Sequence, residues 1–148
     1  MSLDVGALML ETVPFARTLG VAFDEVADGR ALCRLPDRED LHNHVAGPHA
    51  GALFTLAESA SGAAMLSLLG DQLSRAVPLA TGATVEYRKL AKGEVRAEAR
   101  LSATRDEVVA KLDAGERPVF DVGVELRDGD GTLVSTVTVT WTLRPNRS

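Results

Sequence analysis

One long proline-free stretch, residues 49–69, constrains the fold more than any other feature of the sequence. Its middle consists almost entirely of small residues, namely Ala57, Ser59, Ala60, Ser61, Gly62, Ala63 and Ala64. Small side chains on every side of a helix let other backbone pack closely all round it, as when a curved sheet wraps around the helix. We therefore expect the longest helix of the chain here, with Pro48 in its first turn and Gly70 as its C-terminal cap.

The second half of the chain alternates apolar and polar residues with a period of two. The apolar series are Val95, Ala97, Ala99 and Leu101, then Phe120, Val122, Val124 and Leu126, then Val137, Val139, Trp141 and Leu143. Such regular alternation predicts antiparallel strands with one buried face and one solvated face. A further strand is expected at about 83–90, and the Asp-Gly-Asp-Gly run at 128–131 predicts a hairpin turn between the last two strands.

Weaker signals complete the order of elements. They are a short helix at 4–12 that stops before Pro14, strands at 21–26 and 30–35 around a turn at Asp28-Gly29, a polar loop at 37–48, and a helical insertion at 105–114. Two strands, a long helix and four further strands predict an α+β fold, in which one antiparallel sheet of five to six strands packs its apolar face on the helix. A chain of 148 residues suits a single domain, 1–148.

Charge and composition argue against several classes of protein. The net charge of -5 does not suit a general nucleic-acid binder, which needs a basic face. Cys33 is the only cysteine, so the chain forms no internal disulfide, and its strand context predicts a buried, structural thiol. There is no run of about 18 apolar residues to span a membrane, and Asp4 and Glu11 do not suit a signal peptide. We expect a cytoplasmic protein with no nucleic-acid or membrane partner.

The polar residues that could carry chemistry gather at 41–51 and continue to Glu58 on the long helix. Three histidines, His42, His44 and His49, lie in or next to this segment. These residue types can bind metals, but no His-Glu-x-x-His motif is present, and we predict neither a metal nor a cofactor. His42 and His44 are interpreted as loop residues that border the site.

This segment resembles the PaaI-type hotdog-fold thioesterases, whose pattern is Asn or Gln, then Gly, then His-Gly-Gly-Ala, then an acid on the central helix. Here the matching residues are Asn43, Gly47, His-Ala-Gly-Ala from His49, and Glu58. The segments PFARTLGV at 14–21 and TVEYRKLAKGEVRAEARL at 84–101 also resemble the family, so the likeness spans nearly the whole chain. The resemblance implies a hotdog fold, a curved sheet around one long central helix, and an acyl-CoA-type thioesterase that works as a homodimer or homotetramer.

In such families the Asn and His come from one subunit and the acid from the other. Helix geometry supports this division, because nine residues give ~13 Å of rise and ~900° of rotation, which places Glu58 on the side opposite His49. The resemblance makes Asn43, His49 and Glu58 catalytic. Glu58 would be a general base or a nucleophile, His49 would polarise the thioester, and Asn43 would orient the water or the carbonyl. The N–H groups of Ala50 and Gly51 would stabilise the oxyanion.

Substrate-binding candidates are Gly47 beside the site and Arg88, Lys89 and Lys92, which would hold the phosphates of coenzyme A. Each candidate also has a structural interpretation. The acid could be paired or reach solvent, the histidine could be satisfied by backbone at the helix start, the asparagine could serve turn chemistry, and the cations could be ordinary surface charge.

Two other functions remain open at this point. Ala50 stands where the family has its first Gly, which favours a non-catalytic hotdog protein that binds acyl-CoA or lipid. A hotdog hydratase carries an Asp followed five residues later by His, a spacing that Asp37 and His42 share. The surrounding sequence does not match that motif, and the helix motif points to hydrolysis.

Overall fold

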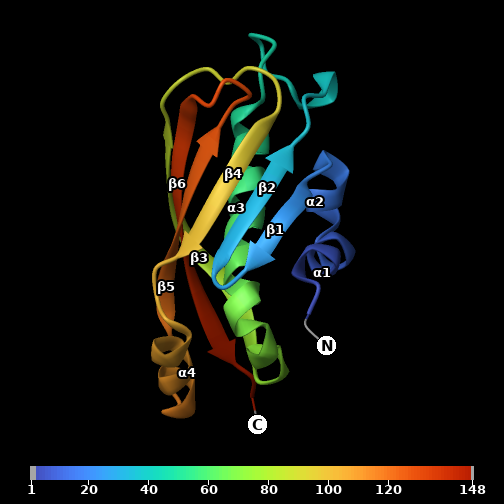
Figure 1. Ribbon diagram of the computed structural model, residues 1–148. Coiled ribbons are helices and arrows are strands. Elements are labelled where there is room, and N and C mark those ends of the chain that lie inside the picture. The colour runs from blue at the N-terminus through green and yellow to red at the C-terminus, as the bar shows by residue number, and fades with distance from the viewer. Residues whose placement is uncertain (1–2, 148) are drawn as a thin grey trace.

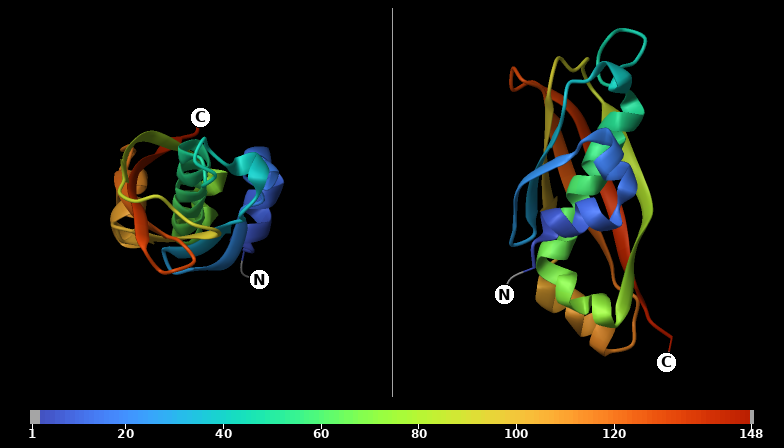
Figure 2. Two further views of the ribbon diagram at one scale, coloured as in Figure 1. Left: turned by 90° about the horizontal axis from the view of Figure 1, so that it is seen from above. Right: turned by 90° about the vertical axis from the view of Figure 1, so that its right-hand side faces the viewer.

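Six antiparallel strands curl around the long helix α3 (Ala50–Leu69) in the computed structural model, which describes residues 3–147 (Figure 1). The strands are β1 (Ala22–Ala27), β2 (Arg30–Leu35), β3 (Ala76–Tyr87), β4 (Val95–Leu101), β5 (Val119–Arg127) and β6 (Leu133–Pro145). They lie in the order β1-β2-β4-β5-β6-β3, which leaves β1 and β3 at the two edges. Seen from above, the sheet passes round several sides of α3 (Figure 2). The predicted α+β fold with one sheet and one central helix is confirmed.

The edge strand β3 differs most from its prediction. It begins at Ala76 rather than near residue 83, and it pairs with β6 along its whole length except for an irregularity between Ala80 and Gly82. Pro78 and Gly82 weaken the strand signal in the sequence, because proline cannot donate to a ladder and glycine packs no side chain. Both residues are tolerated here since one side of β3 has no neighbouring strand.

The shorter helices follow local rules. The expected first helix is α1 (Val5–Thr12), capped by Asp4, whose Oδ1 accepts the Ala7 N–H at 3.0 Å. Pro14 starts a second short helix that the sequence analysis did not foresee, α2 (Pro14–Leu19), because proline suits a first helical position. The expected insertion is α4 (Arg105–Asp113), which a capping box of Thr104 and Glu107 opens.

The C-terminal end of α3 agrees with the prediction, whereas its N-terminal end differs. Pro48 lies outside the helix, because His49 is the N-cap. Gly70 is the C-terminal cap, as predicted, and its N–H donates to the Leu66 carbonyl; its φ is -58°, and the chain continues into a short 3-10 helix, η2 (Gly70–Ser74). Arg105 binds this end of α3, donating to the Leu68 carbonyl at 2.6 Å and pairing with Asp71.

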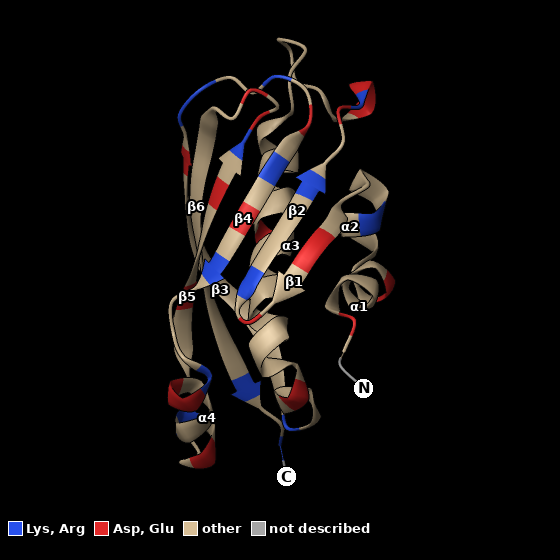
Figure 3. Cartoon of the chain, viewed as in Figure 1, with Lys and Arg blue, Asp and Glu red and all other residues tan. Residues whose placement is uncertain are grey.

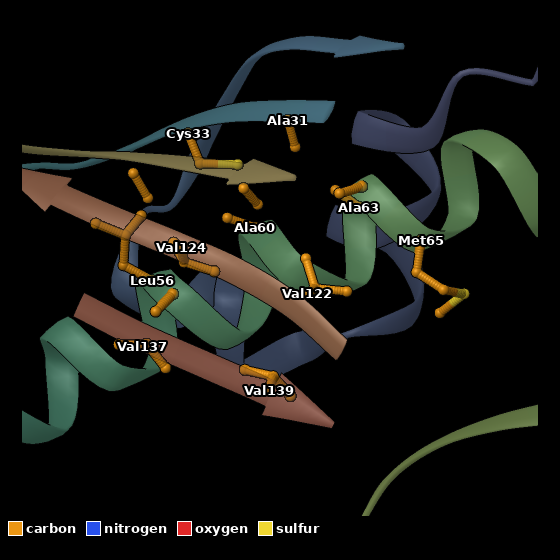
Figure 4. Close-up of a cluster of buried hydrophobic side chains, with 14 of the residues drawn as sticks. Ala31, Cys33, Leu56, Ala60, Ala63, Met65, Val122, Val124, Val137 and Val139 are labelled. Carbon is orange, nitrogen blue, oxygen red and sulfur yellow. The ribbon is translucent and has the colours of Figure 1, made fainter. Parts of the chain in front are cut away.

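The core lies between the sheet and α3. Figure 4 shows Ala60 and Ala63 of the helix facing Cys33, Val122 and Val124 of the strands. Cys33 is buried, as predicted, and burial raises the pKa of its thiol to about 12. The small residues of α3 thus bring its backbone close to the sheet.

The stretch Ala50–Ser74 is long and apolar enough to cross a membrane, with a mean hydropathy of 1.4 in its most apolar window. No unbroken apolar run marks this stretch in the sequence, which is why a membrane span was not expected there. Since 72% of that window is buried inside the fold, the apolar character of this stretch is that of a core helix.

Candidate functional site

The N-terminal half of α3 has one face that the rest of the chain leaves open. Gly51 is exposed, and Phe54, Thr55 and Glu58 are only partly buried, whereas every residue from 59 to 66 is buried. These four residues are three or four positions apart, so they form one stripe along the helix. The helix packs mainly on β2, β4, β5 and β1, and the edge strand β3 is not among its main contacts.

The edge strand β3 is correspondingly uncovered. Ala80, Ala83, Val85 and Tyr87 lie in register with inward-facing residues of β6, so their side chains are on the helix side of the sheet. Even so, Ala80, Ala83 and Tyr87 are exposed and Val85 is only partly buried. The open face of α3 and the inner face of β3 are therefore two uncovered surfaces, in which Glu58 is the one acidic residue among those named.

Glu58 is the carboxylate of the open stripe. Desolvation by burial raises the pKa of this carboxyl above its ordinary value. Within residues 3–147 its carboxylate forms no ion pair and accepts no hydrogen bond, although its backbone carbonyl accepts the Ser61 hydroxyl at 2.7 Å. A half-buried acid with no partner in its own chain is typical of a group that acts on a ligand or on another subunit.

His49 caps α3 with its imidazole. Its Nδ1 accepts the Gly51 N–H at 2.8 Å, so Nδ1 carries no proton and a neutral ring presents its Nε2–H. The side chain is otherwise exposed. The expectation that Gly51 offers a free oxyanion donor is therefore wrong for this conformation, because the cap occupies its N–H. The Ala50 N–H has no acceptor within residues 3–147.

Asn43 organises the loop before α3. Its Oδ1 accepts the N–H groups of Val45 and Gly47 at 3.0 and 3.1 Å, and its Nδ2 donates to the Pro48 carbonyl at 3.3 Å. These contacts support the turn interpretation of Asn43. Gly47 serves a close approach between two loops, because a Cβ at this position would lie 3.2 Å from the Ala91 carbonyl oxygen.

A cleft of about 360 Å³ lies between the loop at 43–48, the start of α3 and the loop between β3 and β4. Its lining residues are Asn43, Val45, Ala46, Gly47, Pro48, Ala50, Leu53, Tyr87, Lys89, Leu90, Ala91, Lys92 and Gly93. No acidic side chain lines it, and neither lysine forms an ion pair in the part of the chain that the structure describes. Lys and Arg positions are visible in blue along the loop between β3 and β4 in Figure 3. The cleft therefore suits an anionic ligand with apolar parts.

Other predicted residues lie outside the cleft. Arg88 pairs with Glu86 at 3.3 Å and donates to Thr136 Oγ1, which places it on the outer face of the sheet. His44 is exposed. His42 Nε2 lies 2.7 Å from Asp37 Oδ1, so the two residues that share the spacing of the hydratase motif are also in contact. Neither residue lines the cleft. Between residues 3 and 147, no three metal-binding side chains gather.

Comparison with known proteins gives a consistent result. Residues 4–143 match the family model described as a domain of unknown function (DUF4442). A Pseudomonas aeruginosa protein of unknown function, described as a probable thioesterase, is 29% identical, with 99% of each chain covered and a TM-score of 0.86. A second conserved protein of that species is 28% identical, over 87% of this chain and 92% of its own, with a TM-score of 0.70.

The Escherichia coli PaaI protein from the phenylacetic acid degradation operon shares the fold. Its TM-score is 0.73 at 17% identity, with 96% of this chain and 91% of that chain covered. No curated protein matches the chain. These likenesses confirm the predicted hotdog fold.

Proposed function

This chain belongs to the family described as a domain of unknown function (DUF4442), and we propose that it is a thioesterase that hydrolyses an acyl-CoA-type thioester at a site shared by two copies of the chain. The observation that carries the proposal is the position of Glu58, a half-buried carboxylate on the open face of α3 that has no partner within residues 3–147. The printed description of the P. aeruginosa relative as a probable thioesterase supports the reaction class.

A second copy of the chain would cover both uncovered surfaces. The free edge of β3 presents unpaired N–H and C=O groups along 12 residues, which another β3 can pair. The small side chains of Ala80 and Ala83 on its inner face let a partner helix approach closely. A two-fold arrangement then brings Glu58 of one copy towards the helix start of the other.

Glu58 acts as the general base in this proposal. A carboxylate whose pKa is raised is a stronger base than an ordinary glutamate and is matched better to a reaction near neutral pH. It removes a proton from water as the water oxygen bonds to the thioester carbonyl carbon. The tetrahedral oxyanion then collapses, the C–S bond breaks, and the proton passes from Glu58 to the leaving thiolate, which gives a carboxylic acid and a free thiol.

The helix start of the other subunit stabilises the oxyanion. His49 offers its Nε2–H, since its Nδ1 accepts the cap hydrogen bond, and Ala50 offers a backbone N–H next to the positive end of the α3 dipole. Asn43 acts through the loop that it holds in place. Lys89 and Lys92 at the cleft neutralise phosphates of the coenzyme A moiety.

The test is thiol release from a panel of alkyl and aryl acyl-CoAs by the wild type and by Glu58→Gln. We expect kcat of the variant to fall by about 10²–10⁴-fold. Glu125→Gln makes the same chemical change on the exposed outer face of the sheet, and it is expected to retain wild-type turnover. Turnover by Glu58→Gln at the wild-type rate, or no thiol release from any member of the panel, would contradict the proposal.

A mixing experiment tests whether two copies share the site. Glu58→Gln and His49→Ala are each expected to be inactive, but a mixed dimer of the two has one site with both groups intact. Random mixing should restore about a quarter of the wild-type activity, since half of the dimers are mixed and each holds one intact site of two. Recovery of no activity, with mixed dimers verified by mass, would place both groups of a site in one chain.

A further inference from the structure

The loop at 88–93 carries both lysines of the cleft, yet it belongs to no helix or strand. Backbone hydrogen bonds hold its first part, because the N–H groups of Arg88 and Lys89 donate to the Val134 carbonyl at 2.8 and 3.2 Å. Its second part is held differently. There the Lys92 N–H donates to the carboxylate of Asp128 at 3.3 Å, across 36 positions of the sequence.

Asp128 lies at the start of the turn between β5 and β6, and it is only 6% exposed. Its Oδ1 accepts the N–H groups of Asp130 and Thr132 at 3.0 and 3.2 Å, which closes the turn. Its Oδ2 accepts the N–H of Lys92. One oxygen therefore serves the turn, and the other reaches a different loop.

A turn of this kind does not require a carboxylate. One side-chain acceptor, such as that of Asn or Ser, closes the same hydrogen bonds without burying a charge. The contact of the second oxygen with Lys92 explains why this residue is an acid. A carboxylate has two acceptor oxygens, whereas the amide of Asn would present a donor to one of the two loops. From this contact we infer that Asp128 is a positioning residue, which fixes Lys92 where it meets the phosphates of the substrate. This inference rests on the proposed function and deepens it.

Two effects of Asp128 on phosphate binding have opposite signs. As a negative charge near the cleft it opposes an anionic ligand, so removing the charge alone would strengthen binding. As a tether it lowers the cost of ordering the loop, so releasing the loop would weaken binding. The direction of the change therefore separates positioning from simple electrostatics.

Asp128→Asn is the informative variant. Its amide oxygen still closes the turn. Its NH₂ group faces the Lys92 N–H, and because both groups are donors they form no hydrogen bond. We expect KM for acyl-CoA to rise about fivefold to thirtyfold with kcat retained, the size of effect that a broken hydrogen bond gives. KM for an acyl-pantetheine thioester, which lacks the nucleotide phosphates, should change little. Amide exchange at Lys92 should become faster.

The matched control is Asp130→Asn. It removes the same charge from the same turn, but Asp130 is exposed, and among residues 3–147 its side chain forms no hydrogen bond or ion pair with the loop. We expect it to leave KM unchanged or slightly lowered. Asp128→Ser is a second test variant, because a hydroxyl can close the turn but is too short to reach Lys92. It should raise KM as Asp128→Asn does.

Several outcomes would overturn the inference. These are equal KM changes in Asp128→Asn and Asp130→Asn, a lowered KM in Asp128→Asn, or an equal rise in KM for both substrates. If the wild type releases no thiol, only the proposed function is contradicted. The variants are then compared by their calorimetric Kd values for coenzyme A in place of KM. If the wild type does not bind coenzyme A either, the inference falls as well.

Discussion

The two halves of α3 have similar small residues but opposite surroundings. Residues 59–66 are buried on every side, and Gly62 lies between the side chains of Trp141 and Met9, at 3.5 and 3.6 Å from the position of a Cβ. In residues 50–58 the same helix leaves a stripe that no other part of residues 3–147 covers. In the second half, Met9 of α1 and Trp141 of β6 pack against Gly62. The small residues of the second half thus serve close packing, whereas the stripe with Phe54 and Glu58 in the first half stays accessible.

Leucine substitutions in the two halves should have the largest contrast. Ala60→Leu places a large side chain at a position with no exposed surface, and we expect overpacking to destabilise the fold by about 1–3 kcal/mol. Thr55→Leu lies on the open stripe, and at protein concentrations where the chain is monomeric its unfolding free energy should change by no more than about 0.5 kcal/mol. Urea unfolding measures both. Equal losses would show that the stripe is as enclosed as the core.

A smaller effect is expected at the hydrogen bond that closes the second half. The buried Trp141 Nε1–H donates to Ser61 Oγ at 3.0 Å. A double-mutant cycle of Trp141→Phe and Ser61→Ala should give a coupling energy of about 0.5–1.5 kcal/mol. Unfolding free energies of the four proteins measure it. A coupling energy of zero would mean that α1 and the apolar contacts alone close this half.

The sequence predicted the enclosed half of α3 better than the open half. Periodic apolar residues such as Val122 and Val124 report burial directly, so the strands β4, β5 and β6 and their packing on the helix followed from the pattern. The residue pattern of an edge strand predicts its bounds poorly. For that reason the sequence did not predict that β3 begins at Ala76, two residues before Pro78. A strand without a second neighbour needs less regular alternation.

The sequence suggests candidate residues for the site but not the contacts that they make. The motif pointed to His49 and Asn43, yet the cap that His49 places on Gly51 depends on one rotamer, which no spacing reveals. Asp128 was interpreted only as part of a hairpin turn. Its link to Lys92 joins segments 36 positions apart, and nothing local in either segment signals it. Such tertiary hydrogen bonds are the part of a site that a single sequence leaves open.

The smallest expected effect is the pH dependence of stability at Glu58. Burial raises the pKa of this carboxyl in the folded chain, so the folded state binds more protons than the unfolded state once pH exceeds the ordinary value for glutamate. Stability therefore falls as pH rises through the window between the unfolded and the folded pKa, and the loss persists above it. The effect is modest because the side chain is only half buried.

Glu58→Gln carries no charge at any pH, so it should match the wild type at low pH, where the glutamate is protonated, and exceed it at neutral pH. Thermal unfolding midpoints from pH 4 to pH 8 measure the difference, with Glu125→Gln on the outer face as the matched control. Parallel curves for the wild type and Glu58→Gln would mean that a partner compensates the charge. Since no group within residues 3–147 pairs with this carboxylate, that result would assign the compensation to the second copy of the chain and would locate the open half of α3 inside the subunit interface.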